Sequence, residues 1–135
     1  MRIVAVVLFY GYVATLLVAG AWGMVEARLD QRLLFGLDLT TLPATHAATL
    51  VSQYRFLRAI ELGYGLFAWR YRTAILRPSP YSTVFLTTMA LGVLARIISL
   101  VLDGRPEAVF LFFLIYEAVA VVIIWMTVRR TPRAA

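Results

Sequence analysis

Four charged side chains lie deep inside long apolar stretches of this 135-residue chain, away from the ends of the stretches, where they could pair, bind a polar headgroup or relay protons. They are Arg58, Glu61, Arg96 and Glu117. An ionisable group at membrane depth costs about 2.5–3.5 kcal/mol on insertion scales, so each one needs a partner or a function. Two are cationic and two anionic, which favours an Arg58–Glu61 pair and an Arg96–Glu117 pair. We assign a catalytic role to none of them.

The elements that must position these residues are four apolar runs, each long enough to cross a membrane. A span needs about 20 residues, because the hydrocarbon layer is about 30 Å thick and a helix rises about 1.5 Å per residue. In lipid the backbone must satisfy its own hydrogen bonds, which predicts helices. The expected fold class is therefore all-α, an integral membrane four-helix bundle in a single domain over residues 1–135. The predicted spans are residues 3–22, 50–69, 81–102 and 108–128.

Helical spacing is expected to bring the charges together. At about 100° per residue, Tyr54, Arg58 and Glu61 fall on one face of the second span. A tight turn at Asp103-Gly104-Arg105-Pro106 makes the third and fourth spans an antiparallel hairpin, which puts Glu117 within reach of Arg96. The small residues of the first span suit close helix packing, and they are Gly11, Thr15 and Ala19.

One interpretation of the charges is an outward polar pocket bounded by the second, third and fourth spans. Ser99 and Asp103 would lie at its mouth. Its walls would be Tyr54, Tyr64, Phe110, Phe113 and Tyr116. The competing interpretation is structural, in which the pairs hold helices together and fix their register at about 0.6 kcal/mol per polar contact. Both interpretations stay open at this point.

Composition excludes several other classes of function. Hydrophobic residues make up 62% of the chain, more than a soluble domain of this length can bury. There is no cysteine and no lysine, which removes disulfides, thiolate zinc sites and Schiff-base chemistry. The net charge of +6 comes from arginines between the apolar runs, which argues against nucleic acid. His46 is the single histidine and has no metal-ligand spacing around it, so we expect no metal and no cofactor.

The arginine distribution predicts the orientation in the membrane, because cytoplasmic loops are enriched in positive charge. Three arginines flank one side of the spans, namely Arg28, Arg32 and Arg105. Seven flank the other, namely Arg2, Arg70, Arg72, Arg77, Arg129, Arg130 and Arg133. Both termini are therefore expected in the cytoplasm, with the chain integral to the plasma (inner) membrane as a multi-pass protein. Arg55, near the outer end of its span, is expected to reach the headgroups.

The outer loop, residues 23–49, is the one sizeable connection. Its first part, from Met24 to Phe35, predicts an amphipathic helix on the outer surface, ended by Gly36. Its apolar face would carry Val25, Leu29 and Leu33, and Glu26, Asp30 and Arg32 would face water.

A second interpretation concerns the N-terminal run, where Ala19-Gly20-Ala21 is compatible with the cleavage site of a secretory signal.

The segment Arg96-Ile97-Ile98-Ser99-Leu100-Val101-Leu102-Asp103-Gly104-Arg105-Pro106, with Glu117 in the next run, resembles the bacterial family catalogued as domain of unknown function 4345. The stretch from Arg58 through Gly65 is similar to that family's charged second helix. The resemblance covers most of the chain and implies a small four-helix membrane protein without an established activity. It extends distantly to the DoxX-like group, some of which are linked to quinone or thiol redox systems, although the absence of cysteine argues against a thiol role here.

Three functions remain as hypotheses. The leading one is a non-enzymatic membrane protein that binds a small amphiphile, lipid or quinone-like, in the outward pocket. The second is a small structural or accessory subunit of a larger membrane complex, and a homo-oligomer is also compatible with the sequence. The third is an enzyme that modifies a lipid or quinone, with Glu117 or Glu61 as the proton carrier. Membrane lipid is the partner common to all three.

Overall fold

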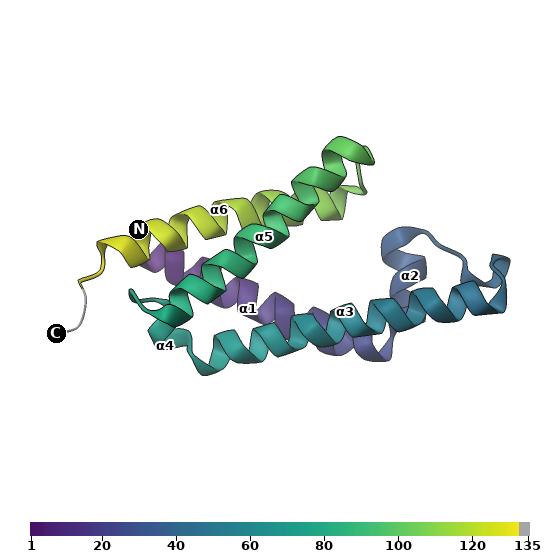
Figure 1. Ribbon diagram of the computed structural model, residues 1–135, viewed down its shortest axis with the longest axis horizontal. Helices are drawn as coiled ribbons and strands as arrows, with labels where there is room; N and C mark the ends of the chain where they lie inside the picture. The colour runs from purple at the N-terminus through teal and green to yellow at the C-terminus, as the bar shows by residue number, and fades with distance from the viewer. Residues whose placement is uncertain (133–135) are drawn as a thin grey trace. The chain divides into compact units, whose positions relative to one another are not determined.

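A computed structural model describes residues 1–132, and in this range the chain forms helices and turns without a strand. Figure 1 shows the elements in chain order. They are α1 (Arg2–Val25), α2 (Ala27–Phe35), the short 3₁₀ helix η1 (Leu39–Thr41), α3 (Ala44–Arg70), α4 (Arg72–Ile75), α5 (Pro80–Leu102) and α6 (Ala108–Arg130). The predicted all-helical class is confirmed.

Three of the helices are long and apolar enough to cross a membrane, namely α1, α5 and α6. They contain the first, third and fourth predicted spans. At 27 residues, α3 is the longest helix, and at about 1.5 Å per residue it measures about 40 Å. Every 18-residue stretch within α3 includes Arg55, Arg58 and Glu61, so its composition alone does not mark it as a span.

The start of α3 differs from the prediction, because the helix begins at Ala44 rather than near residue 50. Pro43 precedes it, and the Pro43 carbonyl accepts a hydrogen bond from the backbone N–H of Ala47 at 3.0 Å. Proline is well suited to such a position, since its fixed φ fits a helix start and it has no N–H to satisfy. The added residues include Thr45, His46 and Thr49, so apolar length alone did not predict that the helix extends over them.

The chain divides into two compact units, and α1 and α3 each contribute to both. The first unit comprises Met1–Tyr12 and the described residues from Ala68 onward, so it holds α4, α5 and α6. The second unit is Val13–Phe67 and holds α2, η1 and most of α3.

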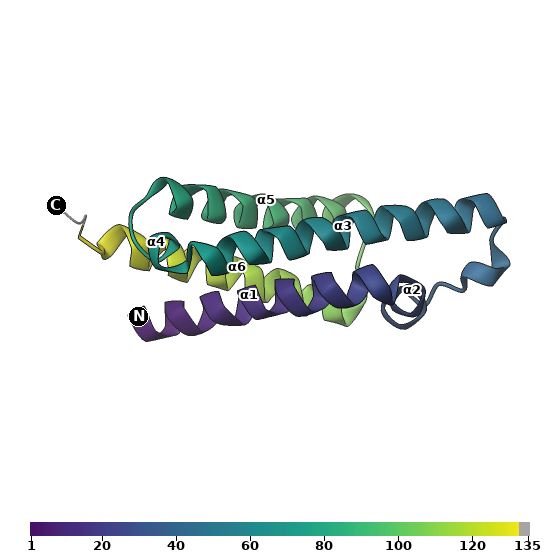
Figure 2. The ribbon, with the colours of Figure 1, turned by 90° about the horizontal axis from the view of Figure 1, so that it is seen from below.

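In the first unit α5 and α6 form the predicted hairpin, which Figure 2 shows from below the view of Figure 1. Gly104 allows the turn, because its φ of 94° lies in a region that side chains rarely adopt. At the other end, the Ser79 hydroxyl and the Ser82 backbone form a capping box that begins α5. The core of this unit is apolar, with Phe9 and Phe85 fully buried and their ring centroids 5.3 Å apart.

In the second unit α1 and α3 pack closely at glycine. A Cβ added to Gly20 would lie 2.7 Å from the backbone nitrogen of Leu62, and one added to Gly65 would meet Leu16 at 3.1 Å. The predicted small-residue ladder of Gly11, Thr15 and Ala19 did not include these two close contacts. Gly20, which the sequence offered as part of a cleavage site, has a packing reason to be glycine.

The segment after α2 folds back on α3 instead of forming an open loop. Gly36 ends α2 as predicted, with a φ of 62°. Leu39, Val51 and Tyr54 then belong to one small buried cluster. Asp38 begins η1 by accepting hydrogen bonds from the hydroxyl and the backbone N–H of Thr40 at 2.7 and 2.9 Å. These hydrogen bonds, the hydroxyl's above all, hold the pKa of Asp38 below its usual value.

Candidate functional site

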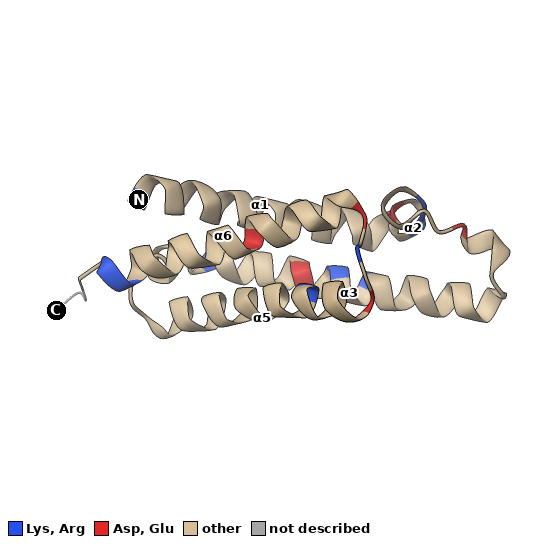
Figure 3. Cartoon of the chain, turned by 90° about the horizontal axis from the view of Figure 1, so that it is seen from above, with Lys and Arg blue, Asp and Glu red and all other residues tan. Residues whose placement is uncertain are grey.

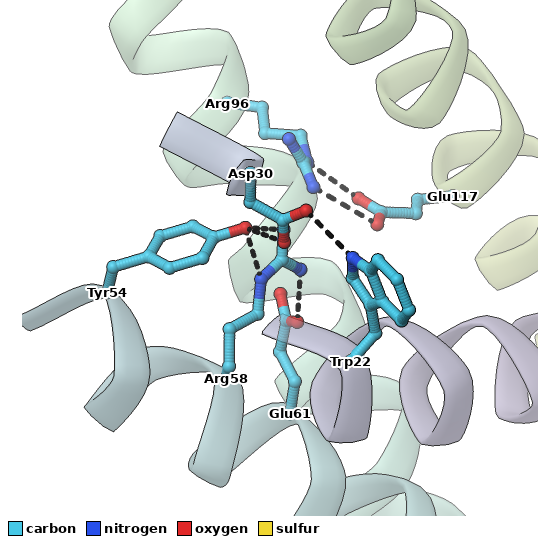
Figure 4. Close-up of polar contacts among 7 residues, drawn as sticks. All are labelled: Trp22, Asp30, Tyr54, Arg58, Glu61, Arg96 and Glu117. Carbon is cyan, nitrogen blue, oxygen red and sulfur yellow. Dashed lines mark hydrogen bonds and ion pairs between the residues drawn. The ribbon is translucent and has the colours of Figure 1, made fainter. Parts of the chain in front are cut away.

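A hydrogen-bonded chain of five side chains lies in the second unit and joins α1, α2 and α3 (Figure 4). Asp30 of α2 accepts two hydrogen bonds, from the Trp22 indole Nε1 at 3.0 Å and from the Tyr54 hydroxyl at 2.7 Å. The Tyr54 oxygen in turn accepts from Arg58, whose Nε lies 2.7 Å away and whose Nη2 also contacts it. Arg58 Nη1 completes the chain with Glu61 Oε2 at 2.6 Å.

The predicted Arg58–Glu61 pair is thus present, with a tyrosine on its other side. The Arg58 guanidinium is largely covered, and its side chain is 14% exposed against 37% for Glu61. Its stem passes over Gly23, where an added Cβ would lie 2.6 Å from Arg58 Cγ. The guanidinium also lies 4.7 Å from the centroid of the Tyr54 ring. Most of the hydrogen-bonding capacity of Arg58 is therefore used by Tyr54 and Glu61.

The prediction that Asp30 faces water is wrong, because this side chain is 5% exposed. A buried carboxylate needs donors, and the Trp22 and Tyr54 side chains supply them. The apolar periodicity of the segment did not predict this, since it placed Glu26, Asp30 and Arg32 on the face opposite Val25, Leu29 and Leu33. A usable signal was the pair of aromatic donors on the flanking helices, Trp22 and Tyr54, because indole N–H and phenol O–H groups usually find an acceptor in a folded protein.

The second ion pair lies in the first unit, on the α5–α6 hairpin. Arg96 Nε donates to Glu117 Oε2 at 2.9 Å, and Arg96 Nη2 donates to Glu117 Oε1 at 3.4 Å. This two-point contact is the predicted Arg96–Glu117 pair (Figure 4). Burial is unequal, with the Glu117 side chain 11% exposed and the Arg96 side chain 34% exposed. The buried carboxylate of Glu117 therefore fixes the guanidinium of Arg96, and part of the Arg96 side chain stays exposed.

Several other predicted residues form hydrogen bonds outside the two ion pairs. The Ser99 hydroxyl donates to Asp103 Oδ2 at 2.8 Å, and both residues are exposed at the end of α5. Tyr116, expected as a pocket wall, donates through its hydroxyl to the Leu8 carbonyl of α1 at 2.9 Å. Arg55 Nε donates to the Met24 carbonyl at 3.1 Å. The convergence of the two ion pairs on one pocket stays a prediction.

Charge is distributed unevenly along the helices, as Figure 3 shows with blue arginines at the end of α6 and red carboxylates near the α5–α6 turn. Within residues 1–132, no three His, Asp or Glu side chains gather as metal ligands.

Within residues 1–132 the chain is helical, and three of its helices are long and apolar enough to cross a membrane, which is the composition typical of a helical membrane protein. Ion pairs inside the apolar segments are consistent with this class. Residues 2–128 match the family model described as domain of unknown function (DUF4345), and the chain belongs to that family. No curated protein matches the chain, and no solved structure matches it.

Proposed function

We propose that this protein is a four-span membrane protein that binds a small amphiphile through the guanidinium of Arg96. The observation that carries the proposal is the unequal burial of the pair on the α5–α6 hairpin: Glu117 is enclosed and Arg96 is one-third exposed. A cation fixed by a buried carboxylate loses little entropy when it binds a further acceptor. A carboxylate or carbonyl headgroup would satisfy the edge that Glu117 leaves open.

The fourth span in this proposal is α3. Its charged residues Arg58 and Glu61 are neutralised by each other and by Tyr54. The exposed large residues of the same helix are mainly apolar, and they include Phe56, Leu57, Ile60 and Leu66. A helix with its charges satisfied inside the protein and an apolar outer surface can lie in lipid at a reduced cost. Four spans with both termini in the cytoplasm would leave α2 at the outer surface.

Thermal protection by defined probes tests the binding. In a non-ionic detergent, we expect decanoic acid and a decyl-substituted benzoquinone to raise the Tm of the wild-type protein. The double variant R96Q/E117Q removes both charges together, so it is expected to fold and to lose this protection. R105Q, in the exposed α5–α6 turn, is the matched control and should keep it. Equal protection of R96Q/E117Q and wild type would reject the proposal.

A second candidate function is a structural or accessory subunit, and the Asp30–Tyr54–Arg58 chain favours it. These three side chains form hydrogen bonds with one another and link α2 to α3. Such links are expected in a rigid structural subunit. R58L/E61L should then abolish copurification of a partner without changing probe binding at Arg96. Loss of probe protection in R58L/E61L with its fold intact would instead assign this pair to the amphiphile site.

A further inference from the structure

The end of the first unit farthest from the Gly104 turn carries a concentration of positive charge without carboxylates. Arg70, Arg72 and Arg77 surround α4, which packs on the start of α5. Arg130 Nη1 lies 3.2 Å from the sulfur of Met1, which brings the start of α1, with Arg2, to the end of α6. The described acidic residues of this unit are elsewhere, at Asp103 and Glu107 near the turn and at Glu117 in its pair.

A cavity of about 920 Å³ opens at this basic end, between the start of α5 and the end of α6. Its lining is amphipathic and includes Pro80, Thr83, Thr87, Trp125, Arg129 and Thr131. Arg129 is exposed and forms no ion pair within residues 1–132, and its guanidinium carbon lies 4.1 Å from the centroid of the Trp125 ring. The cavity therefore presents a positioned cation beside an interfacial tryptophan.

An apolar groove of about 350 Å³ continues from this cavity toward the middle of the two helices. The two spaces share Leu86, Thr87 and Trp125. Beyond them, the groove is lined by Ala90, Val121 and Val122. Both volumes fall within the usual range of small-molecule sites, about 300–1,000 Å³. The cavity is polar and cationic, and it leads into an apolar groove along the α5–α6 hairpin. This arrangement matches a molecule with a charged head and a hydrocarbon tail.

We propose that this α5–α6 groove is a binding site for one anionic phospholipid. Arg129 would hold the phosphate by two-point hydrogen bonding, with Trp125 beside the glycerol region and an acyl chain along Ala90 and Val122. Charge complementarity selects an anionic headgroup, because six arginines lie at this end within residues 1–132 and no carboxylate lines the cavity. The site is separate from the Arg96–Glu117 pair and does not depend on the function proposed for it.

Short-chain lipids in non-ionic detergent test the proposal. We expect dihexanoyl-phosphatidylglycerol to raise the Tm of the full chain, and dihexanoyl-phosphatidylcholine and inorganic phosphate to raise it far less. R129Q should weaken phosphatidylglycerol binding about tenfold, as for the loss of one charged hydrogen-bonding partner. A90L, at an exposed position, should keep the fold and weaken binding by filling the groove. R105Q removes the same charge at the opposite end and should bind as wild type.

Each alternative has a distinct result. Equal effects of the two lipids would reject headgroup selection. An equal effect of inorganic phosphate would show that the apolar groove is not used. Wild-type affinity in both R129Q and A90L, or equal weakening in R129Q and R105Q, would overturn the site. A second copy of the chain in the groove would appear as a concentration-dependent dimer that phosphatidylglycerol does not dissociate, and this too would contradict the proposal.

Discussion

At the scale of single residues, Arg96 and Glu117 show how burial sets the cost of breaking an ion pair. Replacing Glu117 with leucine would leave the Arg96 guanidinium without its partner in an apolar segment. We expect E117L to lower the free energy of unfolding by about 3 kcal/mol, the low end for such pairs because Arg96 is one-third exposed. Thermal or denaturant unfolding in detergent measures the loss.

Double-mutant analysis separates direct pairing from other effects of these side chains. R96Q/E117Q should be more stable than the sum of the two single glutamine variants predicts, because it leaves no unpaired charge. R105Q is the control for removing one arginine from the same hairpin and should change stability by less than about 0.5 kcal/mol. Strict additivity of the two single variants would contradict a direct interaction.

Asp30 is the residue whose role depends most on its surroundings. D30N keeps the size of the side chain but cannot accept from Trp22 and Tyr54 as a carboxylate does. We expect a loss of about 2 kcal/mol, as for hydrogen bonds to a charged group, together with a change in Trp22 fluorescence. E26Q is the control, because Glu26 lies beside the start of α2 and makes no side-chain cap. Equal stability of D30N and E26Q would show that the network contributes nothing.

At the scale of elements, the contact of α1 with α3 depends on the absence of a side chain at Gly20. The atoms that a Cβ would meet belong to the α3 backbone, at Arg58 and Leu62, and cannot rotate away. We expect G20A to destabilise the protein by about 1–3 kcal/mol, as for overpacking in a tight interface.

Gly63 provides the matched test on α3 itself. A Cβ added there meets nothing within 4 Å, so G63A should raise helix stability by up to about 1 kcal/mol. The opposite signs expected for G20A and G63A distinguish packing from helix propensity. Equal destabilisation by both would mean that the close approach at Gly20 is not the cause.

At the scale of the whole molecule, the number of spans decides which charges face which compartment. Reporter fusions after Arg77 and after Ala135 should read cytoplasmic, and fusions near Asp38 and Gly104 should read external. Ala135 and Arg133 lie outside the described residues. If α3 did not cross, a cytoplasmic start of α1 would put Arg77 and the C-terminus outside and Gly104 inside. The Arg77 fusion therefore discriminates sharply between the two topologies.

The sequence by itself determined what local and pairwise rules can determine. Apolar length predicted the α1, α5 and α6 helices, and positive φ at Gly36 and Gly104 fell where glycine was expected to end a helix or form a turn. The Arg96–Glu117 pair was also predictable, because a short turn fixes the register of an antiparallel hairpin over a few helical turns.

Tertiary structure alone decided the rest. Asp30 is buried because Trp22 and Tyr54, on two other helices, supply its donors, and no periodicity within its own segment records that. The lack of a side chain at Gly20 and Gly23 is explained by the Leu62 backbone and the aliphatic part of Arg58, which a Cβ at these positions would meet. The cavity beside Arg129 and the α5–α6 groove that continues from it are lined by residues of both helices and meet at Trp125. Sequence periodicity assigns residues to a face of one helix, and the partner of that face is set by packing between elements.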